Sequence, residues 1–327
     1  MQRIAVYKYD TFLSEASNNL LKNLSSTDIV SHNCLKFLDA ATFNFHCLIR
    51  RKIADKFFID NSSKKEEVSN AETFFIKNIY DGYEIRIREY TPLKLLSDEV
   101  ILFVHGGGWV QGRIETHDPL CRKISNTLHR KVISVDYRLS PKYKFPIPLN
   151  DVLSAYLWCA ENGYKNIILS GDSVGGNLCA GLCVKLSDMK YNILPISQIL
   201  FYPVLSNDLE SKSFNLFDVG YGLTKEWTKN YIYQYTGAEH NDEKFINNKF
   251  IYPLLEDAKV FPETFLISAG CDVLLDGQLE FVNKLKTAEI NVYQNILNGS
   301  IHGFMTYGKY FDEDISAILN EINTNFV

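Results

Sequence analysis

The stretch Ile167–Asn177, with the sequence IILSGDSVGGN, decides the fold of this chain. Its first residues are apolar and compatible with a strand, and the apolar run Leu178–Leu186 follows its paired glycines. This pattern predicts a strand, a sharp turn and a helix. Ser173 stands at the centre of a Gly-x-Ser-x-Gly pattern, which is typical of a strained turn that exposes a nucleophilic hydroxyl. Glycine at 171 and 175 avoids side chains that would collide with the neighbouring strand and helix.

Alone, this pattern is a weak indication of chemistry, because many glycine-serine turns have no catalytic role. The predicted helix would direct its first amide groups toward negative charge that develops beside the Ser173 hydroxyl. Whether Ser173 is a nucleophile therefore depends on what the rest of the chain supplies.

The composition indicates a soluble globular protein. A chain of 327 residues suits one large domain or two small ones, and 46% apolar with 22% charged residues is ordinary for that class. The net charge of −5 argues against nucleic acid or an anionic membrane as the main partner.

The seven cysteines are scattered, include no Cys-x-x-Cys and mostly have apolar neighbours. They therefore indicate buried free thiols rather than a disulfide framework or a zinc site. The first 20 residues lack the apolar core of a signal peptide, and no window approaches the length of an apolar membrane span. We expect a cytoplasmic protein with no metal or organic cofactor.

The pattern along the chain changes at Ala71. Residues 1–60 have helical spacing, and the polar residues 61–70 form a link. Thr73–Ile79 and Tyr83–Tyr90 indicate a β-hairpin. Strands then alternate with helices, which predicts an α/β fold with a mostly parallel sheet and helices on both faces. The later strands are expected at Val100–Val104, Val132–Asp136, Asn166–Ser170, Ser197–Tyr202, Thr264–Ser268 and Val292–Leu297. The helices are expected near Pro119–Leu128 and at Leu149–Cys159, Val174–Leu186, Leu223–Tyr235, Leu274–Lys286 and Glu313–Ile322.

A glycine-rich loop, His105-Gly106-Gly107-Gly108-Trp109, follows the first buried strand. Consecutive glycines leave amide groups open to a carbonyl oxygen that becomes an oxyanion. The alternatives are a phosphate-binding or merely flexible loop, but the Lys-Ser/Thr end of a P-loop and the G-x-G-x-x-G spacing are both absent. We interpret the loop as the oxyanion loop and His105 as its organiser.

Two further strand ends carry an acid and a histidine, where a parallel sheet places its site. Asp272 follows the strand at 264–268, and His302, between Gly299 and Gly303, follows the strand at 292–297. Asp272 alone is also compatible with a helix N-cap, Asp276 competes as the acid, and a lone histidine is usually structural. The order serine, acid, histidine favours a catalytic set and differs from that of the two serine-protease folds.

Five motifs together resemble the hormone-sensitive-lipase-like carboxylesterases, which include bacterial esterases and arylacetamide deacetylases. They are HGGG at 105–108, DYRLSP at 136–141, GDSVGG at 171–176, DVLLD at 272–276 and HGF at 302–304. The resemblance implies an α/β-hydrolase fold with a helical cap. The expected division is cap helices and link at 1–70, core at 71–204, cap insertion at 205–252 and core at 253–327.

The same resemblance assigns roles by position. It implies Ser173 as nucleophile, His302 as general base and acid, and Asp272 as the group that orients His302. The implied oxyanion donors are the backbone N–H groups of Gly107, Gly108 and Val174. The Tyr137-Arg138 stretch would be structural. The chain departs from the family with Val174 in place of a small residue, Lys142 in place of an acid and Gly277 in place of Glu.

The predicted activity is hydrolysis of short- to medium-chain carboxylic esters through an acyl-enzyme on Ser173. The partner is a small-molecule ester, with no nucleic acid and no stable membrane insertion, and a homodimer is left open. Amide hydrolysis by the same triad is the alternative. A non-catalytic receptor on the same fold is disfavoured, because the triad histidine His302 is present. A long-chain lipase is disfavoured, because nothing in the sequence suggests a large apolar lid. We expect Trp109 in the substrate wall, and weigh Phe12, Phe37, Tyr221 and Trp227 as pocket residues of the cap.

Overall fold

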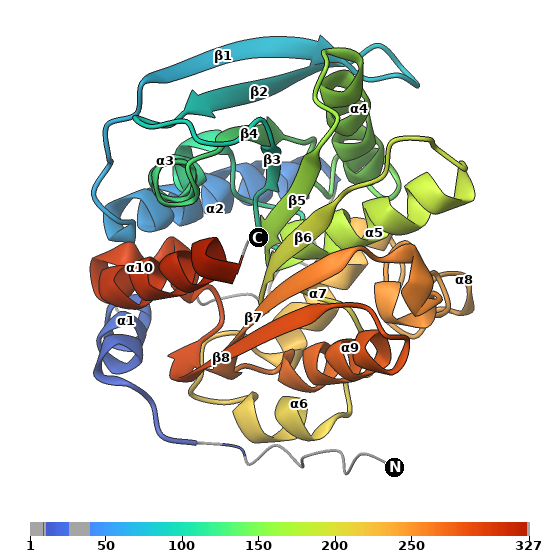
Figure 1. Ribbon diagram of the computed structural model, residues 1–327. Helices are drawn as coiled ribbons and strands as arrows, with labels where there is room; N and C mark the ends of the chain where they lie inside the picture. The colour runs from blue at the N-terminus through green and yellow to red at the C-terminus, as the bar shows by residue number, and fades with distance from the viewer. Residues whose placement is uncertain (1–8, 10, 26–39, 326–327) are drawn as a thin grey trace.

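The computed structural model describes residues 9, 11–25 and 40–325. Its centre is one eight-stranded sheet with the order β1-β2-β4-β3-β5-β6-β7-β8 (Figure 1). Strands β3 to β8 run parallel, while β2 pairs antiparallel with both β1 and β4. The predicted hairpin and parallel sheet are therefore confirmed. The strands are β1 Asn70–Lys77, β2 Glu84–Thr91, β3 Val100–Val104, β4 Lys131–Asp136, β5 Ile167–Asp172, β6 Ser197–Phe201, β7 Glu263–Cys271 and β8 Val292–Ile301.

Helices cover both faces of the sheet. In Figure 1, α3 and α10 lie on one side, where they pack together, and α4, α5 and α9 lie on the other. The central strands are buried on both faces, as their continuous apolar sequences predict. These helices are α3 Ile114–Leu128, α4 Ile147–Glu161, α5 Val174–Asp188, α9 Leu275–Thr287 and α10 Gly308–Asn325. Short 3-10 helices follow at η3 Pro253–Leu255, η4 Ala258–Val260 and η5 Phe304–Thr306.

Two groups of helices lie outside this alternation. The N-terminal group has α1 Glu15–Ser25 and α2 Ala40–Asn61. The second group lies between β6 and β7, with α6 Lys212–Phe217, α7 Lys225–Thr236 and α8 Glu243–Ile246. The predicted helical character of residues 1–60 is thus confirmed for α1 and α2, and the helix expected at Leu223–Tyr235 is α7.

Several element ends differ from the prediction, and the largest differences are at β7, β8 and α10 and at the start of α3, which begins at Ile114 instead of near Pro119. Strand β8 continues to Ile301 instead of ending at Leu297. Its Asn298-Gly299-Ser300 segment has the composition of a turn, but pairing with β7 resumes at Ile301, opposite Cys271, after a register shift. His302 therefore follows a strand directly rather than standing within a loop. Helix α10 begins at Gly308, five residues before the predicted start.

The turn between β5 and α5 has the strained geometry that the glycines indicate. Ser173 has φ 55° and ψ −121°, which L residues rarely adopt. An ideal Cβ on Gly175 would lie 1.9 Å from the carbonyl oxygen of Val104 in β3. Glycine is required here because the first turn of α5 presses directly against the backbone of that strand.

Gly175→Ala is accordingly expected to lower the free energy of unfolding by about 3 kcal/mol, because a backbone oxygen cannot move aside cheaply. Calorimetric thermal unfolding measures the loss. Gly163→Ala is the control, since Gly163 has open space around its Cα and only its positive φ opposes an alanine. That variant is expected to lose only about 1 kcal/mol. Equal losses in both variants would contradict the steric explanation.

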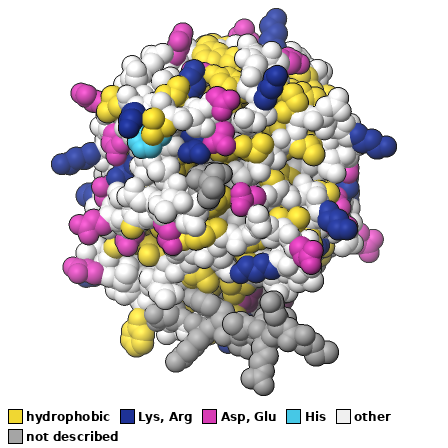
Figure 2. Space-filling view, viewed as in Figure 1, with side chains coloured by type: hydrophobic (Ala, Val, Ile, Leu, Met, Phe, Trp, Pro, Cys, Tyr) yellow, Lys and Arg dark blue, Asp and Glu magenta, His cyan; other side chains and the backbone are white. Residues whose placement is uncertain are grey.

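The distribution of charged side chains and the burial of the cysteines agree with what the composition predicts. Figure 2 shows acidic and basic side chains interspersed over the viewed face. Five cysteines are buried and free, namely Cys121, Cys159, Cys179, Cys183 and Cys271. The side chains of Cys34 and Cys47 lie outside the described part of the chain. In the part that is described, no helix is both long and apolar enough to cross a bilayer.

Candidate active site

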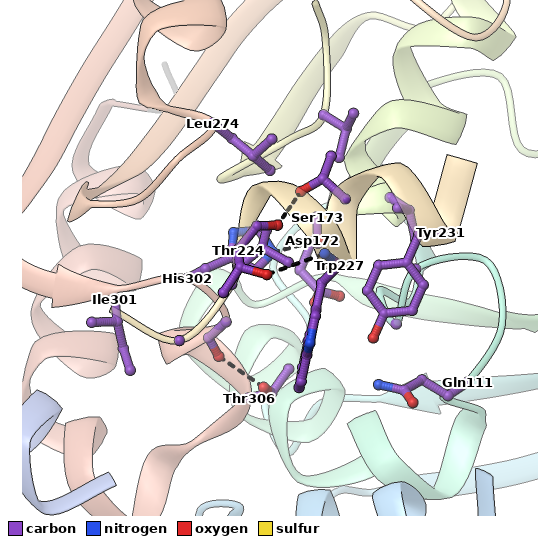
Figure 3. A pocket seen from close by; sticks show the side chains of 18 of the residues that line it. Gln111, Asp172, Ser173, Thr224, Trp227, Tyr231, Leu274, Ile301, His302 and Thr306 are labelled. Carbon is purple, nitrogen blue, oxygen red and sulfur yellow. Dashed lines mark hydrogen bonds between the residues drawn. The ribbon is translucent and has the colours of Figure 1, made fainter. Parts of the chain in front are cut away.

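Three side chains from three strand ends form a continuous hydrogen-bonded chain. The Oγ of Ser173, in the turn after β5, lies 2.8 Å from Nε2 of His302. Nδ1 of His302, after β8, lies 2.7 Å from Oδ2 of Asp272, after β7. Asp272 is fully buried and Ser173 opens into a cavity, where Figure 3 shows it beside His302. The structure therefore brings together the three residues that the sequence singled out.

The two carboxylate oxygens of Asp272 have different partners, and Asp272 is not the N-cap of α9, which is Leu274. Oδ2 faces His302, while Oδ1 accepts a hydrogen bond from Leu274 N at 3.1 Å ahead of α9. The competitor Asp276 lies elsewhere, where it accepts hydrogen bonds from Ser213 N at 2.8 Å and from the Tyr9 hydroxyl. The structure therefore places Asp272, and not Asp276, against His302.

Tyr202, at the end of β6, supports His302 in a way that the sequence analysis missed. Its ring lies edge-on to the imidazole, with centroids 4.9 Å apart, and its hydroxyl accepts a hydrogen bond from Met305 N at 3.2 Å. Tyr202 follows a strand that lies between the strands carrying Ser173 and Asp272. Parallel sheets place their sites at the carboxyl ends of the strands, and this preference would have indicated Tyr202 too.

The glycine loop lies beside Ser173 with its amide groups open. The backbone has positive φ at Gly107, Gly108 and Trp109, and the loop closes on itself because Val110 N and Gln111 N both donate to the Gly107 carbonyl. The N–H groups of Gly107, Gly108 and Val174 donate to no other residue within the described ranges. All three residues line the cavity that Ser173 enters.

His105 is buried beneath this loop. Burial lowers its pKa to about 3, so the imidazole is neutral. Its Nδ1 lies 2.8 Å from the Gly106 carbonyl, and its ring stacks on Tyr137, whose hydroxyl donates to the His105 carbonyl. These contacts support its interpretation as loop organiser. They also support a structural role for the segment at 137–138, since Arg138 pairs with Asp81 and Asp151.

Helix α2 holds the loop from the other side, through two residues one helical turn apart. Arg51 Nε donates to the Val110 carbonyl at 2.7 Å, and Oδ1 of Asp55 accepts from Gly112 N at 3.3 Å. Asp55 also pairs with Arg113 at 3.2 Å. The sequence analysis did not find this contact, because hydrophobic periodicity does not reveal which loop a charged residue of a helix will contact.

The cavity at the site has a volume of about 510 Å³ and a mainly apolar wall (Figure 3). Its lining combines strand-end loops with side chains from both groups of extra helices, including Leu21, Leu24, Phe58, Leu223, Trp227 and Tyr231. Trp109 also lines it, although its ring is almost entirely buried and stacks on Tyr235 at 4.4 Å.

The four aromatic residues considered for the cap have different outcomes. Trp227 lines the cavity, as expected. Phe12 and Tyr221 are not among the lining residues, and Phe12 is 83% exposed. Phe37 lies outside the described residues.

Comparisons with known proteins agree with this geometry. A family profile described as alpha/beta hydrolase fold matches residues 101–306. An arylesterase of Saccharolobus solfataricus is 32% identical over 265 residues, covering 79% of this chain and 83% of that protein. An ethyl acetate hydrolase of Pseudomonas putida is 29% identical over 245 residues, covering 71% and 75%.

Among solved structures, an ester hydrolase from the metagenome of Lake Arreo, in complex with a bipyridine phosphonate derivative, has a TM-score of 0.84. It is 28% identical, and the alignment covers 96% of this chain and 98% of that one. The fold and the serine–histidine–acid arrangement define the class of the α/β hydrolases. Within that class, the chain belongs to the hormone-sensitive-lipase-like carboxylesterase family.

One departure from the family pattern has a local explanation. Where the family commonly has Glu, Gly277 stands so close to Ser206 that an ideal Cβ would lie 2.7 Å from the Ser206 Cβ. A larger residue here would require the segment after β6 to shift.

Proposed function

We propose that this protein is a serine carboxylesterase that hydrolyses short- to medium-chain esters through an acyl-enzyme on Ser173. The observation that carries the proposal is the hydrogen-bonded chain from Asp272 through His302 to Ser173, at the wall of an apolar cavity. The esterase relatives support the reaction class. The general chemistry of such triads supports the individual roles.

Acylation uses each member of this chain. His302 accepts the Ser173 proton at Nε2 while Oγ attacks the ester carbonyl carbon. Asp272 holds the Nδ1–H tautomer and stabilises the imidazolium. The N–H groups of Gly107, Gly108 and Val174 hold the carbonyl oxygen as it becomes an oxyanion.

The tetrahedral intermediate then collapses. The C–O bond to the alcohol breaks, and the alcohol leaves with the proton from His302 Nε2. In deacylation, His302 takes a proton from water, which attacks the acyl carbon, and the same proton returns to Ser173 Oγ. The products are the alcohol and the carboxylic acid, the enzyme is restored, and nothing is oxidised or reduced.

We propose that the helical segments of residues 1–70 and 205–252 form a cap over a core of residues 71–204 and 253–327. Leu21, Leu24 and Phe58 from the first segment and Trp227 from the second contribute to the cavity wall. Such a wall selects apolar acyl and alcohol groups, and its size favours short and medium chains. The free buried thiols suit a reducing compartment, which supports a cytoplasmic location.

The test is hydrolysis of p-nitrophenyl acetate, butyrate, octanoate and palmitate. The expected result is the highest kcat/KM on acetate or butyrate and the lowest on palmitate, because the cavity is limited in size. Diethyl p-nitrophenyl phosphate is expected to inactivate the protein, releasing p-nitrophenol and adding one diethylphosphoryl group at Ser173, located by peptide mass spectrometry.

The same experiment includes p-nitroacetanilide, the amide matched to the acetate. Amide turnover equal to ester turnover would favour the deacetylase alternative. A folded protein inactive on every ester, with no covalent label on Ser173, would overturn the proposal in favour of a receptor.

A further inference from the structure

Two buried ionisable side chains lie beneath the oxyanion loop and have no part in the proposed proton transfers. Asp172 is the last residue of β5 and immediately precedes the nucleophile. His117 lies in the first turn of α3. Its Nε2 is 3.2 Å from Oδ1 of Asp172, and the exposed fractions of the two side chains are 1% and 5%. Both line the cavity, and Figure 3 shows Asp172 near Ser173.

Asp172 anchors the first glycine of the oxyanion loop. Its Oδ1 accepts a hydrogen bond from Gly106 N at 2.8 Å, and an ideal Cβ on Gly106 would lie 2.3 Å from Oδ2. Burial alone would raise the pKa of Asp172, but His117 and the Gly106 amide together hold it below its ordinary value. Asp172 is therefore ionised and can only accept hydrogen bonds.

The hydrogen bonds of Thr116 determine which His117 nitrogens carry protons. Thr116 Oγ1 donates its single proton to the Arg113 carbonyl at 2.7 Å and accepts from Arg113 N at 3.0 Å. The same oxygen lies 2.7 Å from His117 Nδ1, so Nδ1 must be the donor in that contact. On the other side of the ring, Nε2 lies 3.2 Å from Oδ1 of Asp172, at ion-pair distance but outside hydrogen-bond alignment, and that carboxylate can accept a hydrogen bond but cannot donate one.

The other groups around the pair supply no competing charge. The rings of Phe58, Phe103 and His105 lie about the imidazole, with centroids 5.5 to 6.3 Å away. Burial keeps the nearby His105, Tyr137 and Cys121 neutral, since it lowers the pKa of His105 and raises the other two pKa values. Arg51 of α2, whose charge acts on the neighbouring His105, donates to the Val110 and Ser140 carbonyls.

We infer that His117 is held as an imidazolium whose charge neutralises Asp172, so that the oxyanion forms beside a neutral ion pair instead of a bare carboxylate. The inference rests on the proposed esterase mechanism. A negative charge adjacent to the nucleophile would repel the developing oxyanion strongly in this buried site. The carboxylate is nevertheless needed to anchor Gly106. The pair thus allows anchoring without the electrostatic penalty, and both members are positioning residues.

A double-mutant cycle on p-nitrophenyl butyrate tests this inference. His117→Gln is expected to lower kcat by about 100-fold, with KM within about 3-fold, because Asp172 is left as an uncompensated anion. Asp172→Asn is expected to cost about 10-fold, because it weakens the anchor but removes the charge. The double variant His117→Gln/Asp172→Asn is expected to match Asp172→Asn, which means that the second change rescues the first.

Two results of the cycle would overturn the inference. One is a double variant whose loss equals the product of the single losses, and the other is His117→Gln with unchanged kcat. His240→Gln is the matched control, because His240 is outside the cavity lining, and it is expected to keep wild-type kcat. Circular dichroism and thermal unfolding check that every variant folds.

A second measurement needs no substrate and no variant of Asp172. In the wild-type protein labelled with ¹⁵N-histidine, NMR is expected to show both ring nitrogens of His117 protonated at neutral pH, assigned by loss of the signals in His117→Gln. A neutral tautomer would overturn the inference. Since this signal does not depend on turnover, failure of the inference is distinguishable from failure of the proposed esterase function.

Discussion

Replacement of Ser173 by alanine is expected to lower kcat on p-nitrophenyl butyrate by roughly 10⁶-fold. Without Oγ no acyl-enzyme forms, and His302 at 2.8 Å has no hydroxyl to deprotonate. The three open amides remain, so a small rate above the uncatalysed reaction is expected to persist. The measurement is the steady-state rate, with the diethyl p-nitrophenyl phosphate label as an independent check that the reactive group is gone.

Ser170→Ala is the matched control for this variant. Ser170 lies in β5, three residues before Ser173, and its hydroxyl is buried without a hydrogen bond partner among the described residues. Removing it therefore costs no contact, and kcat is expected to stay within about 2-fold of the wild-type value. Ser173→Ala that keeps more than a small fraction of the activity would show that the turn after β5 is not the catalytic centre.

The sequence was sufficient for the fold because its signals are local. Each buried strand appears as a short apolar run, and each βα unit as an alternation between two periodicities. The residues of the candidate site were also accessible, since Ser173, Asp272 and His302 each come within a few residues of the end of an apolar strand. Right-handed βα units bring such ends to one edge of the sheet, so proximity in space follows from position in sequence.

What the sequence did not predict depends on contacts between elements far apart in the chain. His117 meets Asp172 only because β3 and β5 are neighbours, which is a property of the strand order. The hydrogen bond from Arg51 to the oxyanion loop depends on where α2 crosses the core. The β8 end was misplaced for a related reason, since pairing with β7 overrides the turn-like composition of residues 298–300. Tertiary contacts outweigh local preference at each of these positions.

The choice between Asp272 and Asp276, which the sequence left as competitors, leads to a second large expected effect. Asp272→Asn is expected to lower kcat by about 10⁴-fold while the fold remains intact. The asparagine amide donates to Nδ1 of His302 and so favours the tautomer with hydrogen on Nε2. That nitrogen can then no longer accept the Ser173 proton, and the imidazolium loses its counter-charge.

Asp276→Asn supplies the comparison, because its side-chain oxygen can still accept the hydrogen bond from Ser213 N. This variant is expected to keep kcat within about 3-fold of the wild type, since Asp276 has no contact with His302. The pH profile of kcat/KM separates the two explanations of any loss. If Asp272 acts through the tautomer of His302, activity of Asp272→Asn should partly recover at high pH, where hydroxide replaces the missing base. A loss that is independent of pH would mean that Asp272 serves only to hold the turn before α9, through Leu274 N.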